Sequence, residues 1–358
     1  MLSDHAYMER ALLLAGRARG RTTPNPPVGA VVVTPEGVVA GSGFHARAGE
    51  AHAEVHALRE AGEAARGATL YCTLEPCSHF GRTPPCVDRV IEAGVARVVA
   101  AVEDPNVLVS GGGVRRLRQA GVAVDLGVGE GAARRLMRPF FSAIRRRRPY
   151  VIAKAVTSLD GRVAGPGGGP ARLSSSPTDR RTHALRAEVD AIAVGSGTML
   201  ADDPLLTARG VYRERPLARV IFDRRLRTPV SARVFSTLDA GPVIVVAGPG
   251  APAEAARALE SGGAQVLAPD GGLTGAMRQL LPMGIQSVLV EGGPALHTAL
   301  WREGAADAVR LVVSSRALGE AGVPWVEHAV APWASWRLVS VEPCGGDVII
   351  EADVHWTD

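Results

Sequence analysis

The chain has 358 residues and a mass of 37.3 kDa, which at ~100–200 residues per domain favours two domains over one. Its 46% hydrophobic and 21% charged residues exclude an intrinsically disordered chain. The longest apolar runs are strand-sized, below the ~18–20 residues that a membrane-spanning helix needs. No basic segment followed by an uninterrupted apolar run marks an N-terminal signal peptide. We therefore expect a cytoplasmic protein that does not engage a membrane.

Almost all basic side chains other than histidine are arginines. Lys and Arg total 40, and Lys154 is the only lysine, so the other 39 are arginines. Because arginine replaces lysine easily at a surface but not where a compact ammonium is needed, Lys154 is a candidate functional residue. The net charge of +4 permits anionic partners without indicating nucleic-acid binding, and the basic run at 145–148 is typical of a solvated linker.

In the first half of the chain, helical patterns alternate with strand-sized apolar segments, which is typical of an α/β domain. We predict helices at 4–18, from His52, after Cys86, at 114–120 and at 130–145. We predict strands at 28–33, 38–41, 68–74, 95–102 and 122–126. The arginine run and Pro149 then mark a boundary, which gives domains 1–147 and 148–358.

The second half repeats the α/β character without an internal repeat that would relate it to the first. Predicted strands lie at 150–156, 191–195, 218–222, 243–247 and 287–290, with helices at 178–187 and from Ala295. The glycine-rich stretch 165–169 is predicted to be a loop.

The most informative residues are His52 and Glu54, followed by Cys77 and Cys86. One His and two Cys suit zinc and leave a fourth position for water, as in catalytic zinc sites. Glu54 is two residues from His52, a spacing that does not place both side chains on one helical face. We therefore expect Glu54 to meet the water that zinc activates and to act as general acid and base. An H-x-E, P-C, C pattern of this kind is typical of zinc deaminases, whereas the alternative is a chance pattern with buried structural cysteines.

Four cysteines, at 72, 77, 86 and 344, are too few and too unevenly spaced for a disulfide framework, which favours a metal role for the close pair. Cys72 is predicted to belong to a core, and Cys344 is too remote to assign. Eight residues separate Cys77 from Cys86, whereas the general deaminase signature has two. We expect this loop to lie over the site, where His79 and Arg82 contact substrate and the arginine suits a phosphate.

Four segments of the first half resemble the deaminase half of the bifunctional riboflavin-biosynthesis deaminase-reductases. They are Thr23-Pro-Asn-Pro-Pro-Val-Gly-Ala30, Gly41-Ser-Gly-Phe-His45, His52-Ala-Glu54 and Leu74-Glu-Pro-Cys-Ser-His-Phe-Gly-Arg-Thr-Pro-Pro-Cys86. The eight-residue loop is the family's own spacing. The resemblance implies a cytidine-deaminase-like α/β/α fold, with zinc on His52, Cys77 and Cys86 and proton transfer by Glu54. It implies substrate contacts from Asn25, His45, His79 and Arg82. From the residues alone, Asn25 is equally a turn residue between prolines and His45 a loop histidine.

The second half carries two weaker motifs. Val290-Glu-Gly-Gly-Pro294 ends a strand and opens a helix, where backbone N–H groups can bind a phosphate. Gly195-Ser-Gly-Thr198 also follows a strand and fits either close approach to a cofactor or a plain turn. No Gly-x-Gly-x-x-Gly follows a strand, which argues against an ordinary Rossmann domain.

Segments 154–162, 185–186, 197–198, 201–209 and 291–293 resemble, in the same order, the reductase domain of that family. The resemblance implies a dihydrofolate-reductase-like α/β fold that uses NADPH. The residues expected along the cofactor are Thr157, Thr198, Asp202 and Gly293. The residues expected to hold substrate are Arg186, Leu206, Arg209 and Glu291. Lys154 and Asp160 are the catalytic candidates, which orient substrate and help to protonate the nascent amine; alternatively, Lys154 is a strand-end lysine that reaches solvent.

One loop departs from the family. Where the family has Ser and, two residues later, Trp, this chain has Pro170 and Arg172. Substrate and cofactor contacts from this loop are therefore not carried over. Arg172 could stack on a flat ring, or could contact the phosphate that distinguishes NADPH from NADH.

Together with these residues, the resemblance implies a two-step enzyme of riboflavin biosynthesis. Zinc-dependent deamination of 2,5-diamino-6-(5-phosphoribosylamino)pyrimidin-4-one is followed by NADPH-dependent reduction of the ribosyl chain to ribityl, in a homo-oligomer that binds no nucleic acid. The first alternative is a polynucleotide or nucleobase zinc deaminase with a non-reductase second domain, against which the 4% aromatic content argues. The second is a scaffold with structural zinc, in which Glu54 would be the fourth ligand.

Overall fold

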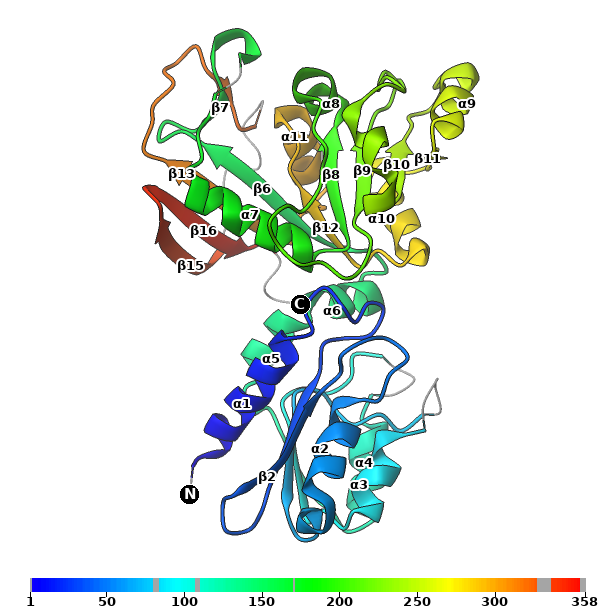
Figure 1. Cartoon of the computed structure of the whole chain (residues 1–358), viewed down its shortest axis with the longest axis vertical. Helices are drawn as coiled ribbons and strands as arrows, with labels where there is room; N and C mark the ends of the chain where they lie inside the picture. The colour runs from blue at the N-terminus through cyan, green and yellow to red at the C-terminus, as the bar shows by residue number, and fades with distance from the viewer. Residues whose placement is uncertain (1, 80–83, 107–109, 170, 327–335, 355–358) are drawn as a thin grey trace. The chain divides into compact units, whose positions relative to one another are not determined.

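The computed structural model describes residues 2–79, 84–106, 110–169, 171–326 and 336–354 (Figure 1). The chain divides into two compact units, Met1–Arg147 and Arg148–Asp358. No helix in the described ranges is long and apolar enough to cross a membrane. Arg82, Pro170 and the other residues between these ranges lie outside the description.

The first unit is a five-stranded sheet in the order β2-β1-β3-β4-β5, with helices around it. Its strands are β1 (Gly29–Val33), β2 (Val39–Phe44), β3 (Thr69–Cys72), β4 (Arg97–Ala100) and β5 (Ala123–Leu126). Its helices are α1 (Asp4–Gly16), α2 (Ala53–Ala61), η1 (Gly62–Ala65), α3 (Cys86–Glu92), α4 (Gly112–Gln119), α5 (Glu130–Leu136) and α6 (Arg138–Arg145). β1 is antiparallel to β2 and β3, whereas β3, β4 and β5 run parallel.

Glycines bring α1 and α2 close to opposite faces of this sheet. A Cβ on Gly29 would lie 2.0 Å from the backbone oxygen of Ala11 in α1. A Cβ on Gly43 would lie 2.6 Å from the backbone oxygen of Ala53 in α2. Gly43 pairs with Ala30, the neighbour of Gly29, so the two glycines face opposite sides. The close contact between Gly43 and Ala53 holds the first turn of α2 directly against the sheet.

The helix predicted at 130–145 is wrong as a single element, because the structure has two helices that separate at Met137. Pro139 lies at the start of α6, where its missing N–H and its ring exclude a continuous helix through this point. The helix predicted at 4–18 ends earlier, at Gly16. The remaining predicted elements of this unit are present with shifted ends.

The second unit is built on a nine-stranded sheet in the order β11-β10-β9-β8-β12-β6-β13-β16-β15, with a small β14-β7 pair beside it. Its strands are β6 (Tyr150–Thr157), β7 (Arg162–Ala164), β8 (Ala191–Gly195), β9 (Ala218–Phe222), β10 (Val243–Val246), β11 (Ala264–Leu267), β12 (Ser287–Val290), β13 (Ala308–Ser314), β14 (Val323–Pro324), β15 (Arg337–Cys344) and β16 (Asp347–Asp353). Its helices are η2 (Pro166–Gly168), α7 (Ser176–Glu188), α8 (Ser196–Asp202), η3 (Arg233–Ala240), α9 (Ala253–Ser261), α10 (Gly272–Leu280), η4 (Leu281–Met283) and α11 (Pro294–Arg302).

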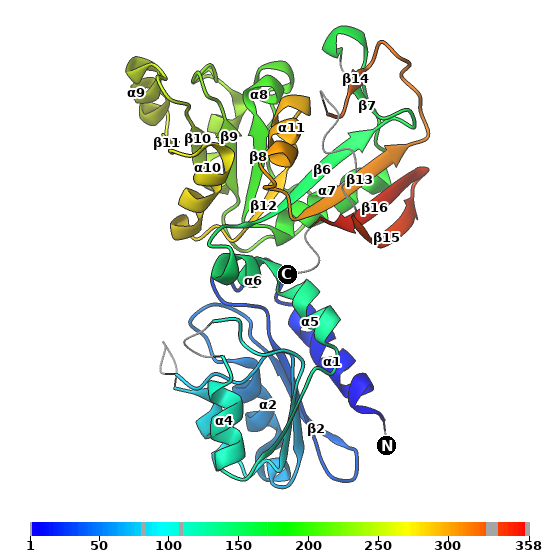
Figure 2. The ribbon, with the colours of Figure 1, turned by 180° about the vertical axis from the view of Figure 1, so that it is seen from behind.

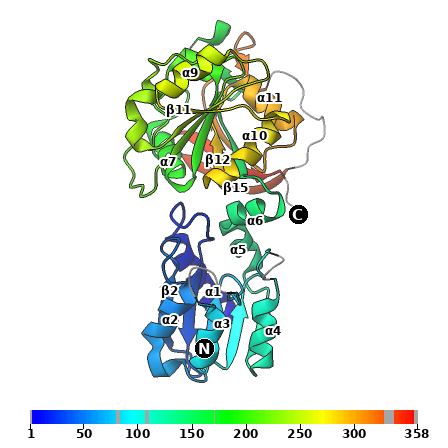
Figure 3. The same cartoon turned by 90° about the vertical axis from the view of Figure 1, so that its right-hand side faces the viewer.

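The strands from β11 to β13 are parallel, and the β16–β15 hairpin extends the sheet in antiparallel fashion. Figure 2 shows this hairpin in red at one edge of the sheet and β11 at the other. Helix α7 lies on one side of the sheet and α10 and α11 on the other (Figure 3). Two apolar cores fill the two sides, one containing Met277 and Leu300 and the other Ile192 and Leu206.

Several elements of the second unit were not predicted from the sequence. They include the strands β11, β13, β15 and β16 and the helices α8, α9 and α10. β13 was not predicted because Arg310 interrupts its apolar pattern. In the structure the Arg310 side chain forms an ion pair with Glu351 on β16. Within the predicted loop 165–169, residues Pro166–Gly168 form a short 3₁₀ turn.

A buried ion pair anchors the first strand of the second unit. Both Arg148 Nη atoms donate to the Asp307 carboxylate, at 2.6 and 2.8 Å, and the backbone N–H of Val151 donates to Asp307 at 2.8 Å. The side chains of Arg148 and Asp307 are 8% and 2% exposed. Loss of one partner would leave the other charge uncompensated in the interior.

We expect Asp307→Asn to lower the free energy of unfolding of the second unit by about 3–5 kcal/mol. All five tryptophans lie after residue 300, so tryptophan emission during urea unfolding follows this unit selectively. The exposed Asp270 supplies the control, Asp270→Asn, for which no shift is expected. Equal unfolding midpoints for the two variants would contradict the prediction.

Candidate active sites

Three predicted metal ligands come together in the first unit. His52 precedes α2 as its N-cap residue, Cys77 follows β3, and Cys86 is the first residue of α3. Their ligand atoms all lie within 4.8 Å of one another. The Nδ1 atom of His52 lies 3.2 Å from Cys86 Sγ and 3.6 Å from Cys77 Sγ. One imidazole and two sulfurs at this separation are the donor set of a zinc site with an open fourth position.

The environment of Cys77 favours its thiolate, which is the metal-binding form. Hydrogen bonding from the Cys86 side chain lowers the pKa of Cys77, and the His52 side chain and the Cys86 N–H add to the effect. That N–H donates to Cys77 Sγ at 3.3 Å. Cys72, in contrast, is fully buried in the core and its burial raises the pKa of its thiol. Cys72 thus lies in the apolar core, as predicted, and outside the cluster of His52, Cys77 and Cys86.

Glu54 lies in the first turn of α2 and is only 3% exposed. Its Oε2 atom has no hydrogen-bond partner among the described residues. Burial raises the pKa of this carboxyl group, and the neighbouring Cys77 thiolate contributes. A buried carboxylate oxygen without a hydrogen-bond partner costs free energy unless a ligand supplies one. Its position beside the three ligands fits a proton carrier for a bound water.

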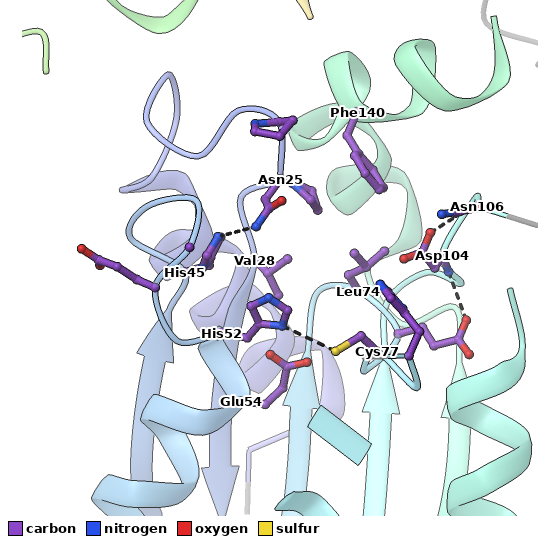
Figure 4. Close-up of a pocket in the computed structure, with 16 residues that line it drawn as sticks. Asn25, Val28, His45, His52, Glu54, Leu74, Cys77, Asp104, Asn106 and Phe140 are labelled. Carbon is purple, nitrogen blue, oxygen red and sulfur yellow. Dashed lines mark hydrogen bonds between the residues drawn. The ribbon is translucent and has the colours of Figure 1, made fainter. Parts of the chain in front are cut away.

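A cavity of about 300 Å³ opens over these groups (Figure 4). The predicted residues that line it are Asn25, His45, His52, Glu54, Cys77 and His79. Arg82, predicted on the same loop as His79, lies outside the described residues. Segments from β1, α2 and the end of β3 thus supply one cavity.

His45 and Asn25 form an ordered pair at the cavity wall. His45 Nδ1 lies 3.2 Å from the backbone oxygen of Ala51, and its Nε2 lies 3.0 Å from Asn25 Nδ2. Burial lowers the pKa of His45, which favours the neutral ring. A neutral ring that donates from Nδ1 to Ala51 accepts at Nε2 from the Asn25 amide. The amide oxygen of Asn25 is then oriented to accept a hydrogen bond from a ligand.

Sequence reasoning missed Glu75, Asp104, Asn106 and Phe140, which also line the cavity. Glu75 is buried and accepts backbone N–H groups from Asp104, Gly111 and Val114 at 3.0–3.1 Å. It therefore joins the segment that carries Cys77 to the segment that follows β4. Asp104 and Asn106 follow β4, which is parallel to β3. Because parallel strands end at the same edge of a sheet, their place after a strand could have predicted that they lie near Cys77.

A second polar cluster lies in the second unit, around Glu291 at the end of β12. Arg186 of α7 donates to its two oxygens from Nε at 2.7 Å and Nη2 at 2.9 Å, and Lys154 Nζ of β6 lies 3.4 Å away. The Glu291 side chain is 9% exposed. Burial acts to raise its pKa, but Lys154 and Arg186 outweigh this and lower the pKa to about 2. Three predicted residues thus form one ionised, preorganised group.

The other predicted residues of this unit divide into two groups. Leu206 is buried beside Thr207, whose carbonyl accepts from Arg186 Nη1, and the backbone N–H of Arg209 donates to His183. Asp160, in contrast, does not contact Lys154. Its exposed carboxylate accepts from Ser158 Oγ and from the backbone N–H groups of Leu318 and Gly319.

The predicted cofactor residues lie where strands end. Thr157 closes β6, Thr198 and Asp202 lie on α8 after β8, and Gly293 caps α11 after β12. A Cβ on Gly293 would lie 3.5 Å from Thr198 Oγ1, so these two segments adjoin. β8 and β12 are neighbours in the sheet, and the chain leaves them in opposite directions. It continues from β8 to β9 on one side, and from β12 to β13, beyond β6, on the other. Such a switch point between parallel strands is where open α/β sheets bind ligands.

The donor set and the buried glutamate beside it are thus those of a zinc-deaminase domain. The comparisons agree. Residues 1–102 match the cytidine and deoxycytidylate deaminase zinc-binding region. Residues 149–350 match the RibD C-terminal domain.

Comparisons over the full length extend the match. The chain is 42% identical to riboflavin biosynthesis protein RibD of Aquifex aeolicus (strain VF5), over 97% of both chains. It is similar to Acinetobacter baumannii RibD, with a TM-score of 0.88 and 35% identity over 98% of each chain. It also resembles a diaminohydroxyphosphoribosylaminopyrimidine deaminase/5-amino-6-(5-phosphoribosylamino)uracil reductase from Thermotoga maritima, with a TM-score of 0.86 and 34% identity over 98% of each chain.

The chain therefore belongs to the RibD family of bifunctional deaminase/reductases of riboflavin biosynthesis. This confirms the predicted family, the two-part fold class and the predicted pair of enzymatic activities. The nucleic-acid deaminase and the scaffold alternatives are not supported.

We expect Cys77→Ser to abolish stable zinc binding, because two ligands are too few for a catalytic zinc site. Zinc content of the purified chain, measured by plasma mass spectrometry, should fall from about one ion per chain to a small fraction. Cys72→Ser is the matched control and should retain the ion, since Cys72 lies outside the cluster. Retention of zinc by Cys77→Ser would refute this ligand set.

Proposed function

We propose that the first unit deaminates 2,5-diamino-6-(5-phosphoribosylamino)pyrimidin-4-one, and that the second reduces the ribosyl chain of the product to ribityl with NADPH. The observation that carries the deaminase assignment is the cluster of His52, Cys77 and Cys86 beside Glu54, whose buried Oε2 atom has no partner among the described residues. The Thermotoga relative, described by these two activities, supports the choice of substrates.

In the deaminase unit, His52, Cys77 and Cys86 would hold the zinc, which would supply a Lewis acid that activates water near neutral pH. Glu54 accepts a proton from the attacking water and delivers it to the departing amine, so that ammonia leaves and oxygen takes its place. Its Oε2 atom is buried and has no hydrogen-bond partner in the part of the chain that the structure describes. Asn25 and neutral His45 orient the pyrimidine, while His79 and Arg82 remain the predicted contacts for the phosphorylated arm.

In the reductase unit, NADPH would supply a hydride to the ring-opened ribosyl carbon, and the attached nitrogen takes a proton to become the amine of the ribityl product. Lys154 is the group that donates this proton, since Glu291 holds its ammonium in place from 3.4 Å. Arg186 fixes the other side of Glu291 and leaves the carboxylate ionised. Asp160 orders the turn after β6 and the loop after β13, which frame the site.

The residues present fit a nicotinamide dinucleotide. The N-terminus of α11 follows Gly292 and Gly293, and the first turn of a helix is where backbone N–H groups can bind a pyrophosphate. The adjoining Thr198 adds a hydroxyl at the same edge. These features support NADPH at the crevice between the ends of β8 and β12.

We also propose that the chain acts as a homo-oligomer. β15 is an edge strand, and its Leu338 and Val341 are 61% and 53% exposed. Exposed apolar side chains on an unpaired edge favour association with a second copy over exposure to water.

We expect Glu54→Gln to lower ammonia release by at least about 10²-fold, because the proton carrier is lost. Zinc content should stay unchanged, since Glu54 is not a ligand. The variant should still oxidise NADPH when it is given the deaminated intermediate. Loss of zinc from this variant would instead make Glu54 a structural ligand.

We expect Lys154→Met to show the opposite pattern. Ammonia release should match that of the parent chain, whereas NADPH oxidation, followed by absorbance, should fall by about 10²-fold or more. Lys154→Arg should oxidise NADPH as slowly as Lys154→Met, because a guanidinium does not give up its proton. Normal NADPH oxidation by Lys154→Met would remove this residue from the mechanism.

A further inference from the structure

We propose that Glu75 is a positioning residue for the deaminase reaction. Its carboxylate holds residues 104–106, which we call the Asp104 turn, at the cavity wall and so sets the affinity for the pyrimidine substrate. The inference rests on the proposed deaminase function of the first unit. It adds a residue that acts through the backbone of a neighbouring segment and neither binds zinc nor carries a proton.

Glu75 lies between a strand and a metal ligand. β3 ends at Cys72, and Cys77 follows Glu75 by two residues. The backbone N–H of Glu75 donates to the carbonyl of Val102 at 2.9 Å, which extends the contact between the segments that leave β3 and β4. Glu75 is only 2% exposed. Because a buried carboxylate is costly without hydrogen bonds, its partners show what this side chain holds in place.

The Glu75 carboxylate accepts three backbone N–H groups in the described part of the chain. Oε2 accepts those of Asp104 at 3.1 Å and Gly111 at 3.0 Å, and Oε1 accepts that of Val114 at 3.1 Å. Asp104 follows β4, whereas Gly111 and Val114 lie at the start of α4. Hydrogen bonds to an ionised acceptor are stronger than neutral ones, and the first turn of a helix favours a negative charge. One side chain thus fixes residues on both sides of the connection between β4 and α4.

The Asp104 turn borders the cavity. Asp104 Oδ1 accepts the backbone N–H of Asn106 at 2.8 Å, which closes the turn. Both residues line the cavity, and Figure 4 shows them on the same side of it as Cys77. Since Glu75 binds the N–H of Asp104, it fixes the backbone of the turn. The position of Glu75 therefore decides the shape and polarity of this wall.

The first turn of α4 packs closely against the segment that carries Cys77. A Cβ on Gly113 would lie 2.1 Å from the backbone oxygen of Pro76, so a side chain at this position would displace either α4 or that segment. The neighbouring Val114 N–H donates to Glu75 and holds this close contact. The carboxylate is thus itself fixed, which lets it define the place of the Asp104 turn.

A positioning role has a kinetic signature that a purely structural role lacks. Neither Glu75 nor the Asp104 turn belongs to the cluster of metal ligands among the described residues. Groups outside the reacting centre bind ground state and transition state alike, so their displacement raises KM and leaves kcat nearly unchanged. A purely structural role lowers the fraction of active chains, which lowers the apparent kcat and leaves KM unchanged.

The experiment measures KM and kcat for ammonia release from 2,5-diamino-6-(5-phosphoribosylamino)pyrimidin-4-one by the full chain. In Glu75→Ala the three N–H groups lose their acceptor. KM should rise about tenfold or more, since a hydrogen bond to a charged group is worth about one decade. The kcat per bound zinc should stay within about twofold of the parent. Zinc content should remain about one ion per chain, and NADPH oxidation with the deaminated intermediate should match the parent.

Glu75→Gln is a graded second variant. Its amide oxygen can accept from Asp104 and Gly111, whereas its NH₂ group cannot accept from Val114. KM should therefore lie between those of the parent and Glu75→Ala. Glu63→Ala, at an exposed position of the same unit, is the matched control and should keep the parent's KM. Far-ultraviolet circular dichroism checks that each variant is folded.

A further set of substitutions tests whether Glu75 acts through the Asp104 turn. Asp104→Ala/Asn106→Ala removes both side chains of this turn that line the cavity. In that background, Glu75→Ala should raise KM by no more than about threefold, because the groups that it positions are already gone. A rise as large as in the parent background would contradict this path.

The parent's KM in both Glu75 variants would overturn the proposal, as would a lowered kcat with an unchanged KM. Loss of zinc from both variants would assign Glu75 to the metal site and would also overturn it. If Glu75→Ala does not fold, the KM of Glu75→Gln alone decides. A parent chain that releases no ammonia from this substrate would overturn the proposed function itself. Normal release by the parent with an unchanged KM in the variants would overturn only the role of Glu75.

Discussion

Parallel strands of one sheet end at a common edge, and both sites of this chain are built from segments that leave such edges. In the first unit, β3 leads to Cys77 and β4 leads to Asp104. Glu75 binds three backbone N–H groups and so holds these two exits together. In the second unit, β12 leads directly to Glu291. The core apolar strands therefore decide where the polar chemistry can occur.

Glu54 and Glu291 are both buried, but their surroundings give the two carboxyl groups different properties. Glu291 lies between Arg186 and Lys154, and these cations keep it ionised despite its burial. Glu54 has no such cation at Oε2, and burial raises its pKa. The first is a fixed negative charge that orients an ammonium, whereas the second can exchange a proton. The local partners of each carboxylate supply this difference.

The sequence predicted the metal cluster because His52, Cys77 and Cys86 are rare residue types in a recognisable order. It did not reveal Glu75, whose role depends on backbone N–H groups more than 25 residues further along the chain. β13 was missed because Arg310 breaks its apolar pattern and finds its partner, Glu351, only on another strand. The break at Met137 was foreseeable from Pro139, since proline acts locally. Side chains that act through distant partners require the fold itself.

The scarcity of lysine gives the chain an unusual chemical property. Apart from the α-amino group, Lys154 carries the only amine, because the remaining basic side chains other than histidine are guanidinium groups. Reagents directed at amines therefore have a single internal target. The Lys154 side chain is 10% exposed and lies next to Glu291. The rate at which such a reagent labels the chain becomes a measure of access to the Lys154–Glu291 pair, without any engineered tag.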